Sequence, residues 1–161
     1  MIVLEELPAG AQRRAYMDLL LLADESPEQV AGYVDLGTLY IAREDDGVAA
    51  GLALVIADGD EAELKSVAVR EDRQGRGVAR AMLTEVIARQ RLAGIRRMTV
   101  ATGSSSLGPL ALYQKLGFRL LRVDRDFFSP ERGYPEEIWE NGIQLRDMVW
   151  LDLDMESDAP R

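Results

Sequence analysis

The feature that most constrains the fold of this chain is a strand–turn–helix–strand pattern between Glu63 and Thr102. The run SVAV (66–69) is apolar and β-branched, as strands are. After a glycine-containing turn, apolar residues recur at helical spacing, and Gly94 is a good stop for that helix. The apolar run MTVAT (98–102) predicts the next strand. A unit of this kind forms a parallel strand pair with a right-handed crossover, so the sequence predicts an α/β fold.

The predicted helix of this unit has an apolar face with a single polar residue on it. A face of this kind indicates an amphipathic helix that packs against a sheet. Its members are Ala79, Met82, Leu83, Val86, Ile87 and Gln90.

The segments on either side predict more strands and helices. Turn signals at 45–47 and 58–60 indicate that three successive strands form an antiparallel meander. Other strands are predicted at 2–7, 118–124 and 143–155, and helices at 9–23, 26–37 and within 103–118. We therefore expect a mixed, mostly antiparallel central sheet with a parallel strand–helix–strand core and flanking helices. One domain is expected over 1–154, followed by a loose tail at 155–161.

The absence of cysteine and histidine excludes several kinds of chemistry. Disulfides, thiol nucleophiles, structural zinc sites and Ser-His-Asp catalysis all need one of these residues. Acid–base work therefore falls to Asp, Glu, Lys or Tyr, and we expect no metal. The net charge of −9 disfavours a nucleic-acid partner, because phosphate binding needs positive surfaces.

Targeting and membrane signals are weak in this sequence. Its longest apolar run, at 47–57, falls short of the roughly 18 residues that indicate a membrane span. The first ten residues have neither the basic start nor the cleavage site of a signal peptide. We expect a cytoplasmic protein with no membrane partner.

The glycine-containing turn QGRGVA allows three phosphate-binding interpretations. A P-loop is excluded, because its string G-x-x-x-x-G-K-[ST] is missing. A dinucleotide fingerprint is weak, because Arg80 stands where the third glycine belongs. The third interpretation is a short turn whose amides open a helix and bind a pyrophosphate, surrounded by Arg73, Arg76 and Arg80. The structural alternative is an ordinary glycine-containing turn that begins a helix and binds no ligand.

This stretch resembles the signature [QR]-x-x-G-x-[GA] of the GNAT superfamily of acyl-CoA-dependent N-acetyltransferases. The signature corresponds to Gln74–Ala79, between an apolar strand and an amphipathic helix. The segment LYQKLGF (112–118) is similar to the second acetyl-CoA helix of the family, and the element order matches over residues 1–154. The resemblance implies a GNAT-like fold and direct transfer of an acetyl group from acetyl-CoA to an amine, without an enzyme nucleophile.

The resemblance also implies which residues bind acetyl-CoA. The pyrophosphate would bind the amides of the turn, and the pantetheine arm would lie along the strand before it. One strand N–H, that of Val67 or Ala68, would polarise the thioester carbonyl. Ser106 stands where the family often has an asparagine, and its shorter side chain can still donate or accept a hydrogen bond. The implied set is Val67, Ala68, Val69, Gln74, Gly75, Arg76, Gly77, Val78, Ala79, Arg80 and Ser106.

Two candidate catalytic residues follow from the same resemblance. Tyr113 lies where the family often places a tyrosine near the thioester sulfur, from which a phenol can protonate the leaving thiolate. Glu63 lies where one branch of the family has its general base. The structural alternatives are a core tyrosine and an exposed glutamate, and water chains or another carboxylate are further options for the base.

The acceptor is a small-molecule or peptide amine whose identity the sequence leaves open. The long connection 125–142 combines aromatic and acidic residues that suit a cationic amine. A surface flap with its aromatics packed on the sheet is the slightly favoured alternative, and a homodimer contact is the third. The alternative function is a degenerate acyl-CoA-binding sensor without turnover.

Overall fold

The computed structural model describes residues 1–24 and 26–156, which form two compact units, Met1–Ile95 and a second unit that begins at Arg96. The expected tail lies outside the described residues from 157 onward. No helix within 1–24 and 26–156 is long and apolar enough to cross a membrane. The same residues contain no cluster of acidic side chains that could hold a metal ion.

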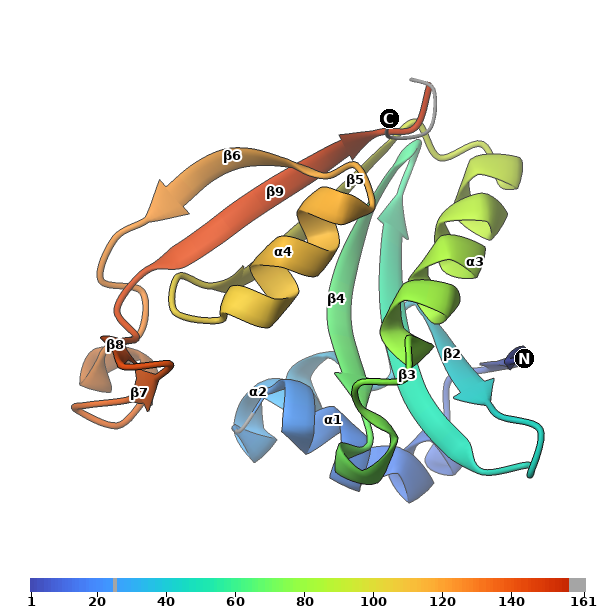
Figure 1. The fold of residues 1–161 in the computed structure, drawn as a ribbon, viewed down its shortest axis with the longest axis horizontal. Helices are drawn as coiled ribbons and strands as arrows, with labels where there is room; N and C mark the ends of the chain where they lie inside the picture. Colours follow the sequence, from blue (N-terminus) through green and yellow to red (C-terminus); the bar gives the residue numbers. More distant parts are fainter. Residues whose placement is uncertain (25, 157–161) are drawn as a thin grey trace. The chain divides into compact units, whose positions relative to one another are not determined.

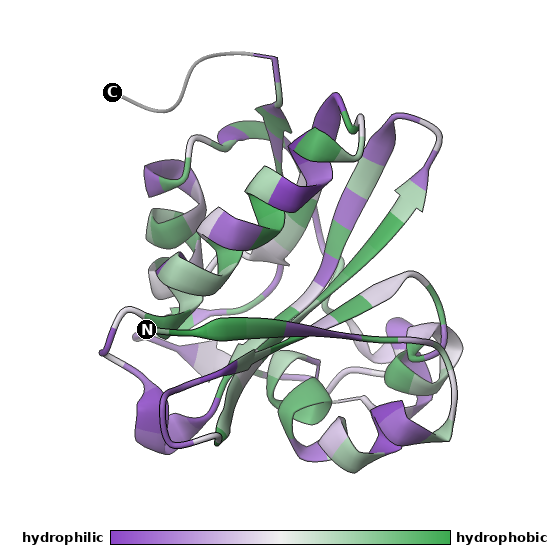
Figure 2. Ribbon diagram, turned by 90° about the vertical axis from the view of Figure 1, so that its right-hand side faces the viewer, coloured by the Kyte–Doolittle hydropathy of each residue, from purple (hydrophilic) through white to green (hydrophobic). Residues whose placement is uncertain are grey.

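The first unit contains an antiparallel four-stranded arrangement (Figure 1). Its strands are β1 (Val3–Leu7), β2 (Thr38–Arg43), β3 (Ala49–Asp58) and β4 (Glu61–Val69), paired in that order. The predicted meander of three strands is therefore confirmed. Hydrophobic residues concentrate along the strands, and the turns between them are largely hydrophilic (Figure 2).

Three helical segments of the first unit lie between β1 and β2 in the chain. The predicted helix at 9–23 begins as a 3-10 helix, η1 (Ala11–Tyr16), and continues as α1 (Met17–Ala23). The short helix α2 (Pro27–Tyr33) has Ser26 as its N-cap, which accepts a 3.3 Å hydrogen bond from the amide of Gln29. Residues of α1 and α2 share a hydrophobic core with Leu52, Leu54 and Ala68 on one face of β3 and β4.

The long helix α3 (Val78–Leu92) packs against the same strands. Its buried residues largely match the predicted face, except that Val78 is buried and Ala79 is only partly so. A Cβ atom at Gly51 of β3 would lie 3.6 Å from the sulfur of Met82, so Gly51 faces α3. Val69 of β4 pairs with Gly51 and therefore lies on the same face of the sheet.

Strand β4 contains a bulge at Lys65. Leu54 pairs with Ser66, whereas the next residue, Val55, pairs with Leu64, so Lys65 is an extra residue on β4. Because side chains alternate along a strand, the extra residue places Glu63 on the same face as Ser66. That face belongs to the α1 and α2 core.

A buried arginine joins the segments at one end of the first unit. Arg13 has no exposed surface, and its guanidinium donates hydrogen bonds to five backbone carbonyls. Burial lowers the pKa of Arg13, but an arginine stays charged in proteins. The carbonyls, at 2.6 to 3.1 Å, belong to Leu7, Pro8, Val34, Leu36 and Gly37.

The second unit contains a three-stranded antiparallel arrangement in the order β5-β9-β6 and a small hairpin, β7-β8. The strand predicted at 143–155 is interrupted between Gln144 and Met148, and Leu145 in this gap is buried. The elements are β5 (Arg97–Gly103), α4 (Leu107–Lys115), β6 (Arg119–Asp124), η3 (Pro130–Arg132), β7 (Trp139–Glu140), β8 (Ile143–Gln144) and β9 (Met148–Asp154). The predicted α/β class is confirmed, and α3 links β4 to β5 in the chain as predicted.

Candidate functional site

The turn between β4 and α3 requires its two glycines for backbone conformation. Gly75 and Gly77 have φ angles of 74° and 79°, the left-handed region that other residues adopt only with strain. A Cβ atom at either position would meet no heavy atom within 4 Å. The glycines therefore set the path of the chain, and the space beside their backbone is open.

This turn presents the amino-terminal end of α3 to that open space. Gly77 is the N-cap of the helix and supplies no side-chain cap, and the first turn of the helix contains no acidic residue. The first amides of a helix carry partial positive charge and lack partners within the helix. The turn also holds itself in place, because the side-chain amide of Gln74 donates a 3.1 Å hydrogen bond to the carbonyl of Val69. The arrangement suits an anion.

The three arginines around the turn differ in their surroundings. Arg73 is held by two carboxylates, each 2.9 Å from its Nη1 atom, and only 15% of its side chain is exposed. The side chain of Arg76 is 52% exposed and lies 3.4 Å from a carboxylate. Arg80, in the first turn of α3, is exposed. Arg76 and Arg80 are therefore available to a ligand, whereas the charge of Arg73 is already neutralised.

The strand residues predicted to contact the ligand lie at the end of β4. Val67 and Val69 are partly exposed, whereas Ala68 is buried in the α1 and α2 core. Glu63 lies on the Ala68 face because of the bulge, and its carboxylate is 3.8 Å from the ammonium of Lys65. Lys65 in turn lies 5.2 Å from the ring centre of Tyr33 of α2. Glu63 is thus a half-exposed carboxylate with a cation beside it.

Tyr113 belongs to the second unit and is buried, with 6% of its surface exposed. Its ring makes an edge contact with Phe118 at a centroid distance of 5.8 Å, and its carbonyl accepts a hydrogen bond from the amide of Phe118. Gly117 allows this fold-back with a φ angle of 103°, as predicted. Burial raises the pKa of Tyr113 well above its usual value, so the phenol keeps its proton at neutral pH.

Ser106 contacts the long connection that precedes β9. Its hydroxyl donates a 3.0 Å hydrogen bond to the carboxylate of Glu140, and the side chain of Asn141 donates to the carbonyl of Ser105. The aromatic residues of the same connection pack on each other, and the guanidinium of Arg132 lies 4.5 Å from the ring centre of Phe127. The expected role of Ser106 toward pantetheine stays a prediction.

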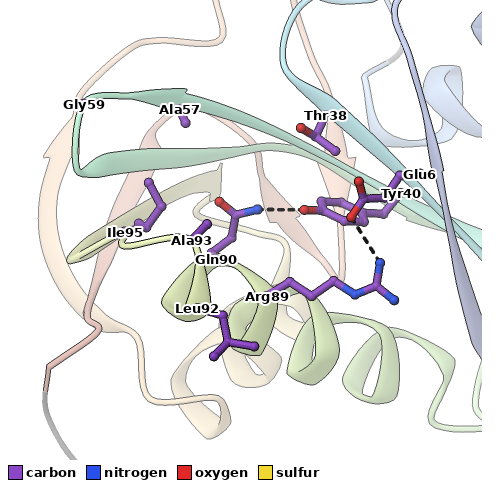
Figure 3. Close-up of a pocket in the computed structure, with 10 residues that line it drawn as sticks. All are labelled: Glu6, Thr38, Tyr40, Ala57, Gly59, Arg89, Gln90, Leu92, Ala93 and Ile95. Carbon is purple, nitrogen blue, oxygen red and sulfur yellow. Dashed lines mark hydrogen bonds and ion pairs between the residues drawn. The ribbon is translucent and has the colours of Figure 1, made fainter.

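A separate hollow in the first unit is lined by both apolar and polar residues, and four of the polar ones bond to each other in pairs (Figure 3). Gln90 donates to the hydroxyl of Tyr40 over 2.8 Å, and Arg89 forms an ion pair with Glu6 at 3.2 Å. Because these polar side chains already bond to each other, the glycine turn is the better candidate for a ligand-binding site.

The structure thus places most predicted binding residues on one continuous path through β4, the turn and α3. Ser106 and Tyr113 belong to the second unit. Sequence reasoning missed the carboxylates that bind Arg73, which come from Glu44 and Asp46 in the turn between β2 and β3. The acidic run at 44–46 was the available signal, but nothing in the sequence pairs it with a particular arginine.

Comparisons with known proteins give the family. A model of the acetyltransferase (GNAT) domain matches residues 35–120. An uncharacterized N-acetyltransferase of Bacillus subtilis, YvbK, is 41% identical over 86% of this chain and 88% of its own. A GNAT family acetyltransferase of Elizabethkingia anophelis, solved with acetyl-CoA bound, is 36% identical, with a TM-score of 0.85 over 95% of this chain and 97% of its own. A Bacillus subtilis acetyltransferase in complex with CoA is 37% identical, with a TM-score of 0.85 over 96% and 99%.

The chain belongs to the GNAT family of acetyltransferases. It is therefore an acyltransferase, and acetyl-CoA is its acyl donor. The open glycine turn at the start of α3 fits this donor, because it offers free space, unpaired amides and two accessible arginines to a pyrophosphate.

Proposed function

We propose that the protein transfers the acetyl group of acetyl-CoA directly to a primary amine of a small molecule or a peptide. The observation that carries the proposal is the turn at Gly75 and Gly77, whose open backbone leads into an uncapped helix. The amides of residues 74–80 bind the pyrophosphate, and the side chains of Arg76 and Arg80 add charge. The main chain of Val67, Ala68 and Val69 takes the pantetheine arm and polarises the thioester carbonyl.

The chemistry divides between a base and an acid. The amine must be neutral when it attacks the thioester carbonyl, and Glu63 is the proposed acceptor of its proton. The carbon–sulfur bond then breaks, and the thiolate takes the proton of Tyr113. Tyr113 is buried and protonated, so it has a proton to give, but its raised pKa makes the phenol a weaker acid than an exposed tyrosine. Ser106 is the further candidate contact with the arm.

The acceptor is proposed only as a class. The ring of Phe127 already has the guanidinium of Arg132 over it, so the connection 125–142 supplies its own cation there. This contact weakens the idea that the same ring binds a cationic amine. The competing function, an acyl-CoA sensor, keeps the binding residues and has no turnover, and a homodimer stays compatible with both.

Calorimetric titration with CoA tests the phosphate site. We expect the wild type to bind and Arg76→Glu to bind at least about tenfold more weakly, because a carboxylate replaces a phosphate-binding cation. Arg91→Glu makes the same charge change at the far end of α3 and should leave binding nearly unchanged. Equal losses in the two variants would contradict the assignment, and a panel of amines with acetyl-CoA then separates an enzyme from a sensor.

A further inference from the structure

The turn between β2 and β3 is joined to the glycine turn by two arginines. Arg73 donates through Nη1 to the carboxylates of Glu44 and Asp46, each at 2.9 Å. The second carboxylate oxygen of Glu44 lies 3.4 Å from Nη2 of Arg76. Glu44 therefore contacts two arginines on either side of Gly75.

The acidic turn is itself well ordered by hydrogen bonds. The amide of Gly47 donates to the carbonyl of Glu44 at 2.9 Å, and the amide of Glu44 donates to the carbonyl of Val48 at 3.1 Å. The amide of Val48 also donates to the carboxylate of Asp46 at 3.1 Å. A turn closed in this way is a fixed support for the arginine that it binds.

The ion pair between Glu44 and Arg73 is largely removed from water. Their side chains are 17% and 15% exposed, so solvent screens this pair less than a pair at the surface. The hydrogen bond from Arg73 to Glu44 is the largest cause that raises the pKa of Arg73, followed by the bond to Asp46. The guanidinium of Arg73 is therefore charged, and its two hydrogen bonds join the acidic turn to the segment before the glycine turn.

We propose that Glu44 and Asp46 are positioning residues for acetyl-CoA: through Arg73 they hold the glycine turn in the conformation that accepts the pyrophosphate, and Glu44 orients Arg76. The proposal rests on the proposed function of that turn. The physical reason is preorganisation. The two glycines allow the backbone of the turn to adopt many conformations. A binding site that is already ordered loses less conformational entropy when its ligand binds.

A positioning role and simple electrostatics predict opposite changes in CoA affinity for the variant Glu44→Gln. A carboxylate near a pyrophosphate repels it, so removal of a negative charge should tighten CoA binding by electrostatics alone. If Glu44 acts by positioning, Glu44→Gln weakens binding despite the favourable change in charge. Asp45→Asn is the matched control, because Asp45 lies in the same turn and forms an ion pair with the N-terminal amine, at 3.5 Å.

The experiment measures the Kd for CoA by calorimetry, and then KM and kcat for acetyl-CoA with the best amine of the panel. We expect Glu44→Gln to raise the Kd and the KM about five- to tenfold and to leave kcat within about twofold, because the tie affects binding of the phosphates and not the thioester. Asp45→Asn should bind CoA as the wild type does, or slightly more tightly. Arg73→Lys, which keeps the charge but loses the geometry, should resemble Glu44→Gln.

The outcomes separate this proposal from the proposed function. If the wild type binds CoA and Glu44→Gln matches Asp45→Asn or binds more tightly, the positioning role is wrong and the phosphate site stands. A loss confined to kcat, with KM unchanged, also overturns positioning. If the folded wild type does not bind CoA, both proposals fail. A merely structural role would lower the Tm of Glu44→Gln without changing the Kd of the folded protein, which again counts against the proposal.

Discussion

The side-chain amide of Gln90 donates a 2.8 Å hydrogen bond to the hydroxyl of Tyr40, joining α3 to β2 inside the first unit (Figure 3). Gln90 is 7% exposed and Tyr40 is 3% exposed. Burial is the largest cause that raises the pKa of Tyr40. Gln90, the only polar residue on the predicted apolar face of α3, is therefore buried with its side-chain amide hydrogen-bonded to Tyr40.

This pair predicts a double-mutant cycle. Tyr40→Phe leaves a buried amide without its acceptor, so we expect it to lower the free energy of unfolding by about 1–3 kcal/mol. Gln90→Leu should cost a similar amount, because it leaves the hydroxyl without its donor. The double variant should recover part of the loss, since both polar groups are gone together. Urea unfolding of the four proteins measures the coupling, and strictly additive losses would show that the two residues act independently.

Removal of the buried guanidinium predicts a large loss of stability. Arg13→Met removes the donor to five backbone carbonyls and leaves them buried without partners. We expect the free energy of unfolding to fall by at least about 3 kcal/mol. The neighbouring Arg14 forms an exposed ion pair with Asp35, so Arg14→Met should change the unfolding midpoint hardly at all. Similar midpoints for the two variants would contradict the role of Arg13.

Two glycines with the same backbone conformation should respond differently to alanine. Gly37 and Gly59 have φ angles of 59° and 64°. A Cβ atom at Gly37 would lie 2.1 Å from the carbonyl oxygen of Val55, whereas one at Gly59 meets nothing within 4 Å. Gly59→Ala should therefore show only the strain of the left-handed conformation, about 1–2 kcal/mol. Gly37→Ala should lose clearly more, and thermal unfolding that ranks them the other way would refute this account.

Tyr113 predicts a separation of turnover from binding. Tyr113→Phe removes the proposed proton donor and keeps the ring contact with Phe118. We expect kcat to fall about 10²-fold, the usual contribution of a general acid, while the Kd for CoA stays within about twofold. Steady-state kinetics and calorimetry on the same preparation check this. Unchanged turnover would leave Tyr113 as a core residue.

The pKa of Tyr113 also predicts a dependence of stability on pH. Its pKa is raised in the folded protein, so the unfolded chain loses the phenolic proton first, near the ordinary value of ~10. Its contribution to stability is therefore complete below about pH 10 and is lost as the pH rises above that value. Urea unfolding at pH 9, 10 and 11 should show a steeper alkaline loss for the wild type than for Tyr113→Phe, by up to about 1.4 kcal/mol per pH unit. Parallel curves would contradict the raised pKa.

The elements whose evidence is local could be predicted from the sequence. Periodic apolar residues gave the strands and helices, and the glycines at 75, 77 and 117 have the left-handed conformations that their positions required. The family followed from a short motif in its strand–helix context, and the comparisons confirm it.

The features that the sequence could not predict depend on contacts between distant segments. Arg13 looks like a surface residue on a predicted helix, and only the carbonyls of two other segments explain its burial. The pairing of Arg73 with Glu44 and Asp46 joins residues far apart in the chain. The bulge at Lys65 has no marker of its own, because its neighbours continue an ordinary strand pattern.

That bulge makes the face on which the candidate base lies depend on how β4 pairs with β3, and not only on the residue types in β4. Regular pairing of Lys65 with Val55, without the bulge, would rotate the start of β4 by one position. Leu64 would then share the face of Ile56, and Glu63 would turn to the other side of the sheet. A design that grafts a new acceptor pocket onto this fold can therefore alter residue types along β4 with some freedom, but a change that closes the bulge while Lys65 is kept would move the carboxylate to the opposite face.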